Sequence, residues 1–254
     1  MWVHVTPKRS RLALAAALFA VGCATPAPPD DDAAASESAV IGEQQDGPPT
    51  DLPEVVQVLV DNRAQDYCTG VLVSPTRVLT AAHCMGGATF LVRAPHAPGA
   101  DGRPQESKAR KAGSVTSSRS YIAEVWKEDA ATLDLETPIR LETYATVEDV
   151  GELDEETTLR AVAVGRSAES RDAPLVKSKE LAVKSGAPLG YTTGLVSQYY
   201  SSGGDSGGPL FLVDEETGEP THVVIGVERQ PDPPREFFTR ITPAVKRLVE
   251  APRR

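Results

Sequence analysis

The sequence predicts an all-β protein built from many short strands. Runs of β-branched and aliphatic residues, several bounded by turn-forming residues, recur between residues 55 and 241. Only 5% of the 254 residues are aromatic, and the chain holds 20 glycines and 21 prolines. This composition fits a loop-rich β protein better than a helical bundle. Many short strands of this kind are typical of a sandwich or a barrel.

The expected strands follow one another along most of the chain. They cover 55–60, 70–73, 77–80, 90–93, 159–164, 222–227 and 237–241. One helix is expected over 243–250, where apolar residues have helical spacing and a proline occupies the first turn. The longest polar connection, 94–120, is expected to be a solvated surface loop.

The first 22 residues have the features of an export signal peptide. Three basic residues precede a short apolar stretch, 12–21, which is too short to span a bilayer. Residues 20–23 resemble a bacterial lipobox, although its first position is usually Leu and here is Ala20. We expect Cys23 to be lipidated, which would hold the protein at a membrane surface. An ordinary signal peptide cut nearby is the alternative.

A flexible tether is expected to follow the signal peptide. Residues 23–53 are rich in Pro, Ala, Ser and acidic residues and cannot bury enough apolar surface to order themselves. The three consecutive aspartates at 30–32 are expected to be solvated rather than to bind a metal. The exported protein would stand on the outer surface or in the periplasm as a lipoprotein, or be secreted after cleavage.

The three cysteines and the net charge limit the possible chemistry. Cys68 and Cys84 flank one apolar run, and an exported protein can hold them as a disulfide. Cys23 is then the odd cysteine, which lipidation would explain. No His and Cys cluster suggests a metal site, so no metal or cofactor is expected. The formal net charge of −10 argues against nucleic acid as a partner.

Two motifs carry residue types that nucleophilic catalysis needs. His83 follows a β-run in Thr-Ala-Ala-His-Cys, where a disulfide at the next residue would give the rigidity that a general base needs. Ser206 lies in Gly-Gly-Asp-Ser-Gly-Gly-Pro, 203–209. Its glycines let the backbone turn sharply and aim consecutive N–H groups at one point, as an oxyanion hole requires.

An acid is needed between these motifs, and the segment 129–135 offers two. Asp129 precedes an apolar strand, so its carboxylate can reach inward from the start of that strand. Asp134 alternates with Leu133 and Leu135 and is expected to face solvent. We therefore expect Asp129 to act with His83.

Two other serine hydrolase classes fit less well. Residues 204–208 also match the G-x-S-x-G elbow of α/β-hydrolases, a fold that needs a helix after the turn and the order Ser, acid, His. Here Pro209 and the apolar run after it continue as a strand, and the best histidine comes first. The order His, Asp, Ser also differs from the Asp, His, Ser order of subtilisin-like enzymes.

Together these motifs resemble those of the chymotrypsin/trypsin-like serine proteases over residues 40–250. Segments 80–84 and 204–209 match the T-A-A-H-C and G-D-S-G-G-P motifs, and 129–135 is similar to D-x-x-x-L-x-L. Segment 68–73 looks like the strand that carries the disulfide partner, and 237–241 resembles the last strand before the C-terminal helix.

The resemblance implies an architecture and a mechanism. The domain 54–254 would hold two packed six-stranded antiparallel β-barrels, over about 54–145 and 146–242, and the helix 243–250. Ser206 would be the nucleophile, His83 the general base and Asp129 its orienting acid. The N–H groups of Gly204 and Ser206 would form the oxyanion hole. The substrate would be a protein or peptide, and the enzyme a monomer.

The resemblance also implies activation by proteolysis. Residues 40–43 resemble the I-V-G-G start of the mature family members, with Glu43 in place of the last glycine. Cleavage after Ala39 would free the amine of Val40 to pair with Asp205 and order the oxyanion loop. Such a cut would also release the protein from a lipid anchor at Cys23.

The region that would select the substrate departs from the family pattern. The segment 197–202 lacks the usual Cys, and the strand 225–229, which carries Glu228, lacks the usual S-W-G. Tyr200, Glu228 and Glu236 are the candidate substrate-binding residues, and by alignment Tyr200 would lie near the base of the substrate pocket and Glu236 near its wall. Glu236 would favour a basic residue, while Tyr200 would narrow the pocket, and both readings stay open.

Two other functions remain possible beside an endopeptidase. An inactive homologue could bind protein through its loops, because a fold does not guarantee activity, and the unusual pocket favours this reading. A structural surface lipoprotein would require the two motifs to be a coincidence. The intact His83, Asp129 and Ser206 favour the enzyme over both.

Overall fold

The computed structural model describes residues 50–61, 67–115, 128–166, 174–201 and 203–253. The expected signal peptide, Cys23 and Val40 lie outside these ranges. Within the described ranges, no helix has the length and apolar character needed to cross a membrane.

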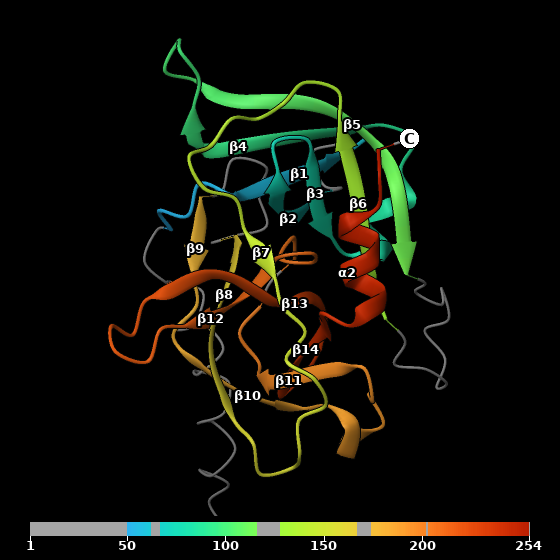
Figure 1. Ribbon diagram of the computed structural model, residues 1–254, viewed down its shortest axis with the longest axis vertical. Coiled ribbons are helices and arrows are strands. Elements are labelled where there is room, and N and C mark those ends of the chain that lie inside the picture. The colour runs from blue at the N-terminus through green and yellow to red at the C-terminus, as the bar shows by residue number, and fades with distance from the viewer. Residues whose placement is uncertain (1–49, 62–66, 116–127, 167–173, 202, 254) are drawn as a thin grey trace, which may run out of the picture. The chain divides into compact units, whose positions relative to one another are not determined.

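Six strands form a first closed antiparallel barrel, in the order β1-β2-β3-β6-β5-β4 (Figure 1). They are β1 (Val55–Val60), β2 (Tyr67–Ser74), β3 (Arg77–Thr80), β4 (Phe90–Pro98), β5 (Pro104–Val115) and β6 (Ala130–Leu135). Closure pairs β1 with both β2 and β4, so the barrel has no free strand edge. A 3-10 helix, η1 (Ala82–Gly86), follows β3.

A second six-stranded barrel follows in the chain. Its order is β8-β12-β13-β14-β11-β10, and pairing of β10 with β8 closes it. The strands are β8 (Leu159–Arg166), β10 (Leu181–Ser185), β11 (Gly194–Gln198), β12 (Pro209–Val213), β13 (Pro220–Asp232) and β14 (Arg235–Arg240). Two short strands are appended, β9 (Leu175–Lys177) to β8 and β7 (Thr146–Val147) to β13. The 3-10 helix η2 (Ala187–Leu189) precedes β11. The predicted fold class is confirmed.

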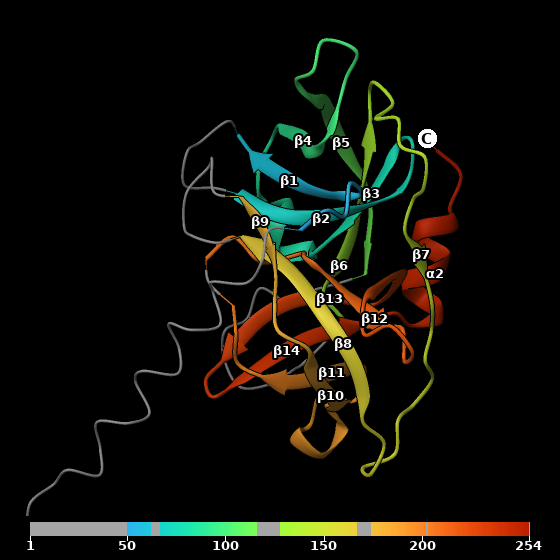
Figure 2. The ribbon, with the colours of Figure 1, turned by 90° about the vertical axis from the view of Figure 1, so that its left-hand side faces the viewer.

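The two barrels share buried apolar surface. Figure 2 shows β1, β2 and β3 above and β10, β11 and β14 below. The core cluster of the first barrel extends to second-barrel residues, namely Val164, Phe211, Val224, Val227 and Ile241. Full burial of such a side chain contributes about 1.5–3 kcal/mol, so this shared core holds the barrels together. Loops of the two barrels can therefore meet in a fixed geometry.

The C-terminal helix α2 (Pro243–Glu250) forms where it was predicted. Thr242 caps it by accepting a hydrogen bond from the Val245 N–H, and a proline occupies the first turn. The helix lies beside β5 and β6 (Figure 1). Arg77 of β3 donates to the carbonyls of Val249 and Ala251, which fastens the end of the helix to the first barrel.

The expectation that Asp134 faces solvent is wrong. Its side chain is buried, and its Oδ1 accepts hydrogen bonds from Arg77 Nε at 3.1 Å and Nη2 at 2.8 Å. The C-terminal segment explains the difference, because Arg77 also binds Val249 and Arg253 donates to the carbonyl of Leu135. This segment covers a face of β6 that strand alternation alone assigns to water.

The expected surface loop 94–120 is also largely wrong. Strand β4 runs on to Pro98, and β5 occupies Pro104–Val115. Only two side chains of β5 are buried, those of Ser107 and Ala109, and the others are half-buried or exposed. An antiparallel strand with one wet face can be largely polar, so its composition resembled that of a loop.

The Arg77–Asp134 pair provides a test of this packing. We expect Arg77→Met to lower the free energy of unfolding by about 3–5 kcal/mol, because it leaves a buried carboxylate without its cation. The double variant Arg77→Met/Asp134→Leu should recover most of the loss, because it removes both charges. Urea unfolding of the three proteins measures this. Equal stability of the wild type and the single variant would contradict the assigned role.

Candidate active site

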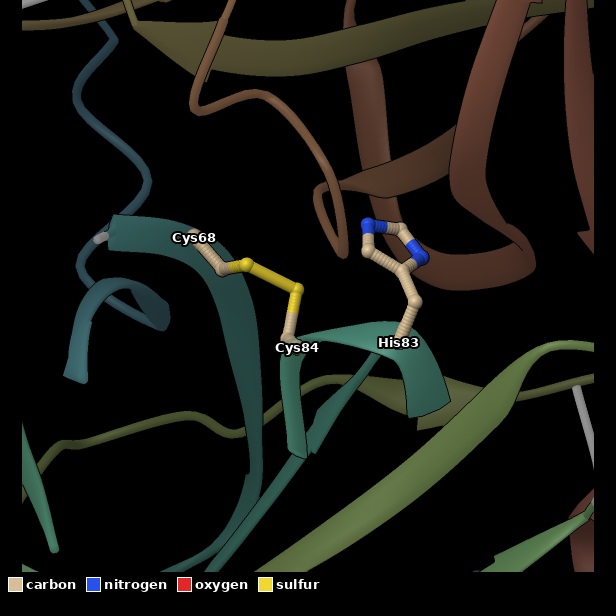
Figure 3. A group of neighbouring side chains, drawn as sticks. All are labelled: Cys68, His83 and Cys84. Carbon is tan, nitrogen blue, oxygen red and sulfur yellow. A yellow bond between two sulfur atoms is a disulfide. The ribbon is translucent and has the colours of Figure 1, made fainter. Parts of the chain in front are cut away.

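His83 is held by a disulfide at the next residue. It lies on η1, and Cys84 beside it is bonded to Cys68 of β2, which confirms the predicted disulfide. Figure 3 shows the imidazole projecting from the turn that the disulfide ties to β2. The side chain of His83 keeps 40% of its surface exposed, so the ring is both anchored and accessible.

Asp129 pairs with His83 through two hydrogen bonds. Asp129 directly precedes β6, and its side chain is only 3% exposed. Its Oδ1 accepts from the backbone N–H of His83 at 2.9 Å, and its Oδ2 is 2.7 Å from Nδ1 of the ring. A carboxylate accepts hydrogen bonds, so Nδ1 carries the proton and Nε2 is left as the basic nitrogen. Asp134 takes no part in this pair.

The Ser206 loop of the second barrel reaches across to the first. The N–H of Thr69 on β2 donates to the Ser206 carbonyl, and the Thr69 hydroxyl donates to the Gly204 carbonyl, both at 2.8 Å. The Ser206 carbonyl oxygen is also 3.7 Å from Cys84 Sγ. These contacts hold the backbone of the Ser206 loop against β2 and against η1, the 3-10 helix that carries His83. Among the described residues, the Ser206 hydroxyl and the His83 ring make no hydrogen bond, and such bonds often tighten only with substrate.

Two glycines give this loop its shape. Gly204 and Gly207 have φ values of +99° and +86°, in the region that favours glycine. A Cβ on Gly207 would overlap the Thr80 hydroxyl, and one on Gly204 would overlap the Tyr67 ring. In the described part of the chain, the N–H groups of Gly204 and Ser206 donate to no backbone carbonyl.

Asp205 points away from solvent, into the second barrel. Its side chain is buried, and its Oδ1 accepts from the backbone N–H of Arg166 at 2.5 Å. The partner that the sequence suggests, Val40, lies outside the described residues. The structure therefore shows a buried carboxylate immediately before Ser206 without testing its pairing with Val40.

The three residues predicted to shape the substrate pocket form a buried acidic cluster. The Tyr200 hydroxyl donates to Glu228 Oε2 at 3.2 Å, and the Ser201 N–H donates to Glu236 Oε2 at 3.3 Å. Tyr200, Glu228 and Glu236 are 7%, 1% and 0% exposed, so they present almost no surface to a substrate. The backbone of Glu228 exchanges hydrogen bonds with Gly207 and Gly208, which places the cluster directly behind the Ser206 loop.

Burial controls the protonation of this cluster. Desolvation raises the pKa of Glu236 to about 7 and raises the pKa of Glu228 well above its usual range. The charge of Glu236 also opposes ionisation of Glu228, and the charge of Asp205 opposes ionisation of both, because like charges close together are unfavourable. The pKa of the Tyr200 hydroxyl is raised as well, first by burial and then by the charge of Glu228.

Three residues that the sequence analysis missed surround Asp129. The Asp129 N–H donates to the Thr239 hydroxyl at 3.0 Å, and Arg229 Nε lies 3.8 Å from Asp129 Oδ2. The hydroxyl of Tyr191 is 3.0 Å from that of Thr239. The one signal in the sequence is Arg229 itself, a charged residue in the strand that lacks the family's usual S-W-G. All three lie far from Asp129 in the chain.

The group Cys68, His83 and Cys84 has the residue types of a metal site, with their ligand atoms within 4.8 Å of one another. The two sulfur atoms are bonded to each other, and a disulfide offers no thiolate to a metal. Among the described residues, this group therefore stabilises the fold rather than binding an ion.

Sequence and structure comparisons agree with this arrangement. The family model described as Trypsin matches residues 41–248. A comparison with curated proteins finds no match. Human heparin binding protein has a TM-score of 0.60 at 16% identity, over 82% of this chain and 97% of its own. The scabies mite inactivated protease paralogue S-D1 has a TM-score of 0.57 at 16% identity, over 82% and 98% of the two chains. A Glu endopeptidase has a TM-score of 0.58 at 15% identity, over 78% and 89%.

The raised pKa of Glu236 predicts a pH-dependent stability. Between pH 4.5 and 7 the folded protein keeps a proton that the unfolded chain releases, so stability falls as the pH rises through this window. The amide in Glu236→Gln does not titrate, so this pH dependence of the stability is lost. We expect its stability relative to the wild type to grow by about 2 kcal/mol between pH 5 and pH 8. Chemical denaturation at the two pH values measures it.

The control is Glu216→Gln, which changes an exposed glutamate to the same amide. Its stability should follow that of the wild type at both pH values. A constant difference between Glu236→Gln and the wild type from pH 5 to pH 8 would contradict the burial argument.

Proposed function

Because this chain belongs to the trypsin family, we propose that it is a serine endopeptidase acting through His83, Asp129 and Ser206. The observation that carries the proposal is the pairing of the buried Asp129 with His83 Nδ1 at 2.7 Å. It leaves Nε2 of the partly exposed ring as the basic nitrogen. The family acts on proteins or peptides, which are therefore the expected substrates.

The proposed reaction has two halves. In the first, Ser206 Oγ bonds to the peptide carbonyl carbon while its proton passes to His83 Nε2, and that proton then goes to the leaving amine as the C–N bond breaks. In the second, a water gives its proton to His83 and attacks the acyl-enzyme, which releases the carboxylic acid and restores the serine. Asp129 holds the ring in the required tautomer and stabilises its charged form.

The negative charge on the reacting oxygen would be stabilised by backbone donors. The N–H groups of Gly204 and Ser206 are suited to this task, because the loop leaves them without backbone partners among the described residues. Losing one such donor typically lowers the rate by about 10²–10³. The mechanism uses no metal and no cofactor.

The second candidate function is a protein-binding homologue without activity. The observation that favours it is the burial of Tyr200, Glu228 and Glu236, which leaves little surface where a substrate side chain is expected. Proteins of similar fold include the scabies mite inactivated protease paralogue S-D1. The intact contact between Asp129 and His83 favours the enzyme.

We further propose that the protein is exported as a lipoprotein anchored at Cys23 and is activated by cleavage after Ala39, acting as a monomer. The support is the buried carboxylate of Asp205, next to Ser206. By the family resemblance, the amine freed at Val40 would pair with this carboxylate. Cleavage would then both order the oxyanion loop and release the enzyme from its anchor.

Fluorophosphonate labelling tests this function without knowledge of the substrate. We expect the wild type, trimmed to begin at Val40, to label at a single serine, and Ser206→Ala to remain unlabelled, because only an activated serine reacts. The same chain with residues 23–39 retained should label at least tenfold more slowly if the amine of Val40 orders the loop. Peptide mapping by mass spectrometry identifies the labelled residue.

Circular dichroism on each sample serves as the folding control. A folded wild type that labels in neither form would overturn the endopeptidase and favour the binding homologue. Equal labelling of both forms would overturn only the activation step.

A further inference from the structure

Asp129 is held from the second barrel as well as from the first. Thr239 of β14 accepts a hydrogen bond from the Asp129 N–H at 3.0 Å. Arg229 of β13 places its Nε 3.8 Å from Oδ2, the same oxygen that accepts from His83 Nδ1. Tyr191, between η2 and β11, hydrogen bonds to the Thr239 hydroxyl at 3.0 Å. Two strands of the second barrel thus contact Asp129 of the first, and a third segment binds one of the two contacting residues.

The Arg229–Asp129 ion pair is largely shielded from solvent. The side chains are 15% and 3% exposed, so water and salt screen their attraction less than at a surface. A buried carboxylate without a countercharge is costly, and neutral His83 supplies only hydrogen bonds. Among the described residues, Arg229 is the one cation paired with Asp129 while His83 is neutral.

Tyr191 gives Arg229 a rigid support. The guanidinium carbon lies 5.6 Å from the centre of the Tyr191 ring, within the range of a cation–π contact. The ring is fully buried and packs edge-on against Phe237 at 6.0 Å. A Cβ at Gly194 would overlap the ring, so the glycine makes room for it. Burial raises the pKa of the Tyr191 hydroxyl, which therefore stays neutral beside Asp129.

We propose that Arg229 is a positioning residue, which holds the Asp129 carboxylate in the orientation that accepts the Nδ1 proton of His83. The proposal rests on the proposed function, because the orientation of His83 matters only if the ring acts as a base. Arg229 touches neither the reacting atoms nor Ser206 in the described contacts. Arg229 would therefore act on His83 through Asp129. Tyr191 contacts the Arg229 guanidinium and Thr239 binds the Asp129 N–H, so both residues help to hold the ion pair in place.

The test compares the kinetics of fluorophosphonate labelling in four variants. Arg229→Met keeps the packing and Arg229→Gln keeps a donor, but both remove the charge. Arg229→Lys keeps the charge. Arg235→Gln removes an exposed arginine from the same barrel and is the matched control. For each protein, the maximal labelling rate and the half-saturating probe concentration are measured separately.

We expect Arg229→Met and Arg229→Gln to lower the maximal labelling rate by about tenfold, because a misplaced catalytic group can cost up to about 10² in rate. The half-saturating concentration should stay within about twofold, because the probe does not bind Arg229. Arg229→Lys should recover most of the rate, and Arg235→Gln should match the wild type. An unchanged maximal rate in the folded charge-removing variants, or no recovery with lysine, would overturn the proposal.

A second measurement does not depend on activity. The proton between His83 Nδ1 and Asp129 gives a low-field NMR signal when the hydrogen bond shields it from water. We expect this signal in the wild type and in Arg229→Lys, and its loss in Arg229→Met. A persistent signal in Arg229→Met would overturn the positioning role. If the wild type shows the signal but never labels, the proposed function fails while the role of Arg229 survives.

Discussion

The burial of one carboxylate where the two barrels meet is the constraint on which the site depends. Asp129 belongs to the first barrel, yet the hydroxyl that receives its N–H and the cation near its Oδ2 come from the second. Burying such a charge is costly unless hydrogen bonds and a countercharge compensate it. The barrels must therefore pack in one relative position for Asp129 to be satisfied, and that position also orients His83.

The Ser206 loop depends on the same junction. Ser206 precedes β12 of the second barrel, but its carbonyl is bound by the N–H of Thr69 on β2 of the first. The disulfide fixes Cys84 against that strand, and His83 is its neighbour. A shift of one barrel would move Ser206 and release Asp129 together. Rigid loops that meet across a shared core can hold catalytic groups more accurately than one flexible loop.

The sequence singles out candidate residues where the signal is local. His83 and Ser206 stand in short motifs whose neighbours, a cysteine and several glycines, serve the same local geometry. Asp129 was proposed as the acid because it directly precedes an apolar strand. The all-β class followed from short β-branched and aliphatic runs, but the two closed barrels required the family resemblance, because strand patterns do not specify which edges pair.

The rest depended on contacts between distant segments. Asp134 was assigned to solvent because its cover, the segment after α2, lies more than a hundred residues later in the chain. Arg229 and Thr239 are likewise remote from Asp129, so no local pattern connects them. Strand β5 was missed because its wet face makes it polar. The burial of Glu236 could not be predicted from its place in the sequence, since it depends on packing between distant segments.

The most direct test of the account is peptide-bond hydrolysis by Asp129→Asn, measured on a denatured protein mixture and compared with the wild type at pH 7. An asparagine keeps the size of the side chain, but its amide carries no negative charge. It therefore cannot hold His83 in the Nδ1-protonated tautomer as the carboxylate does. The account predicts an unchanged fold by circular dichroism and a loss of about 10⁴ in rate. Hydrolysis by the folded variant at the wild-type rate would contradict it, because Asp129 would then contribute nothing to His83.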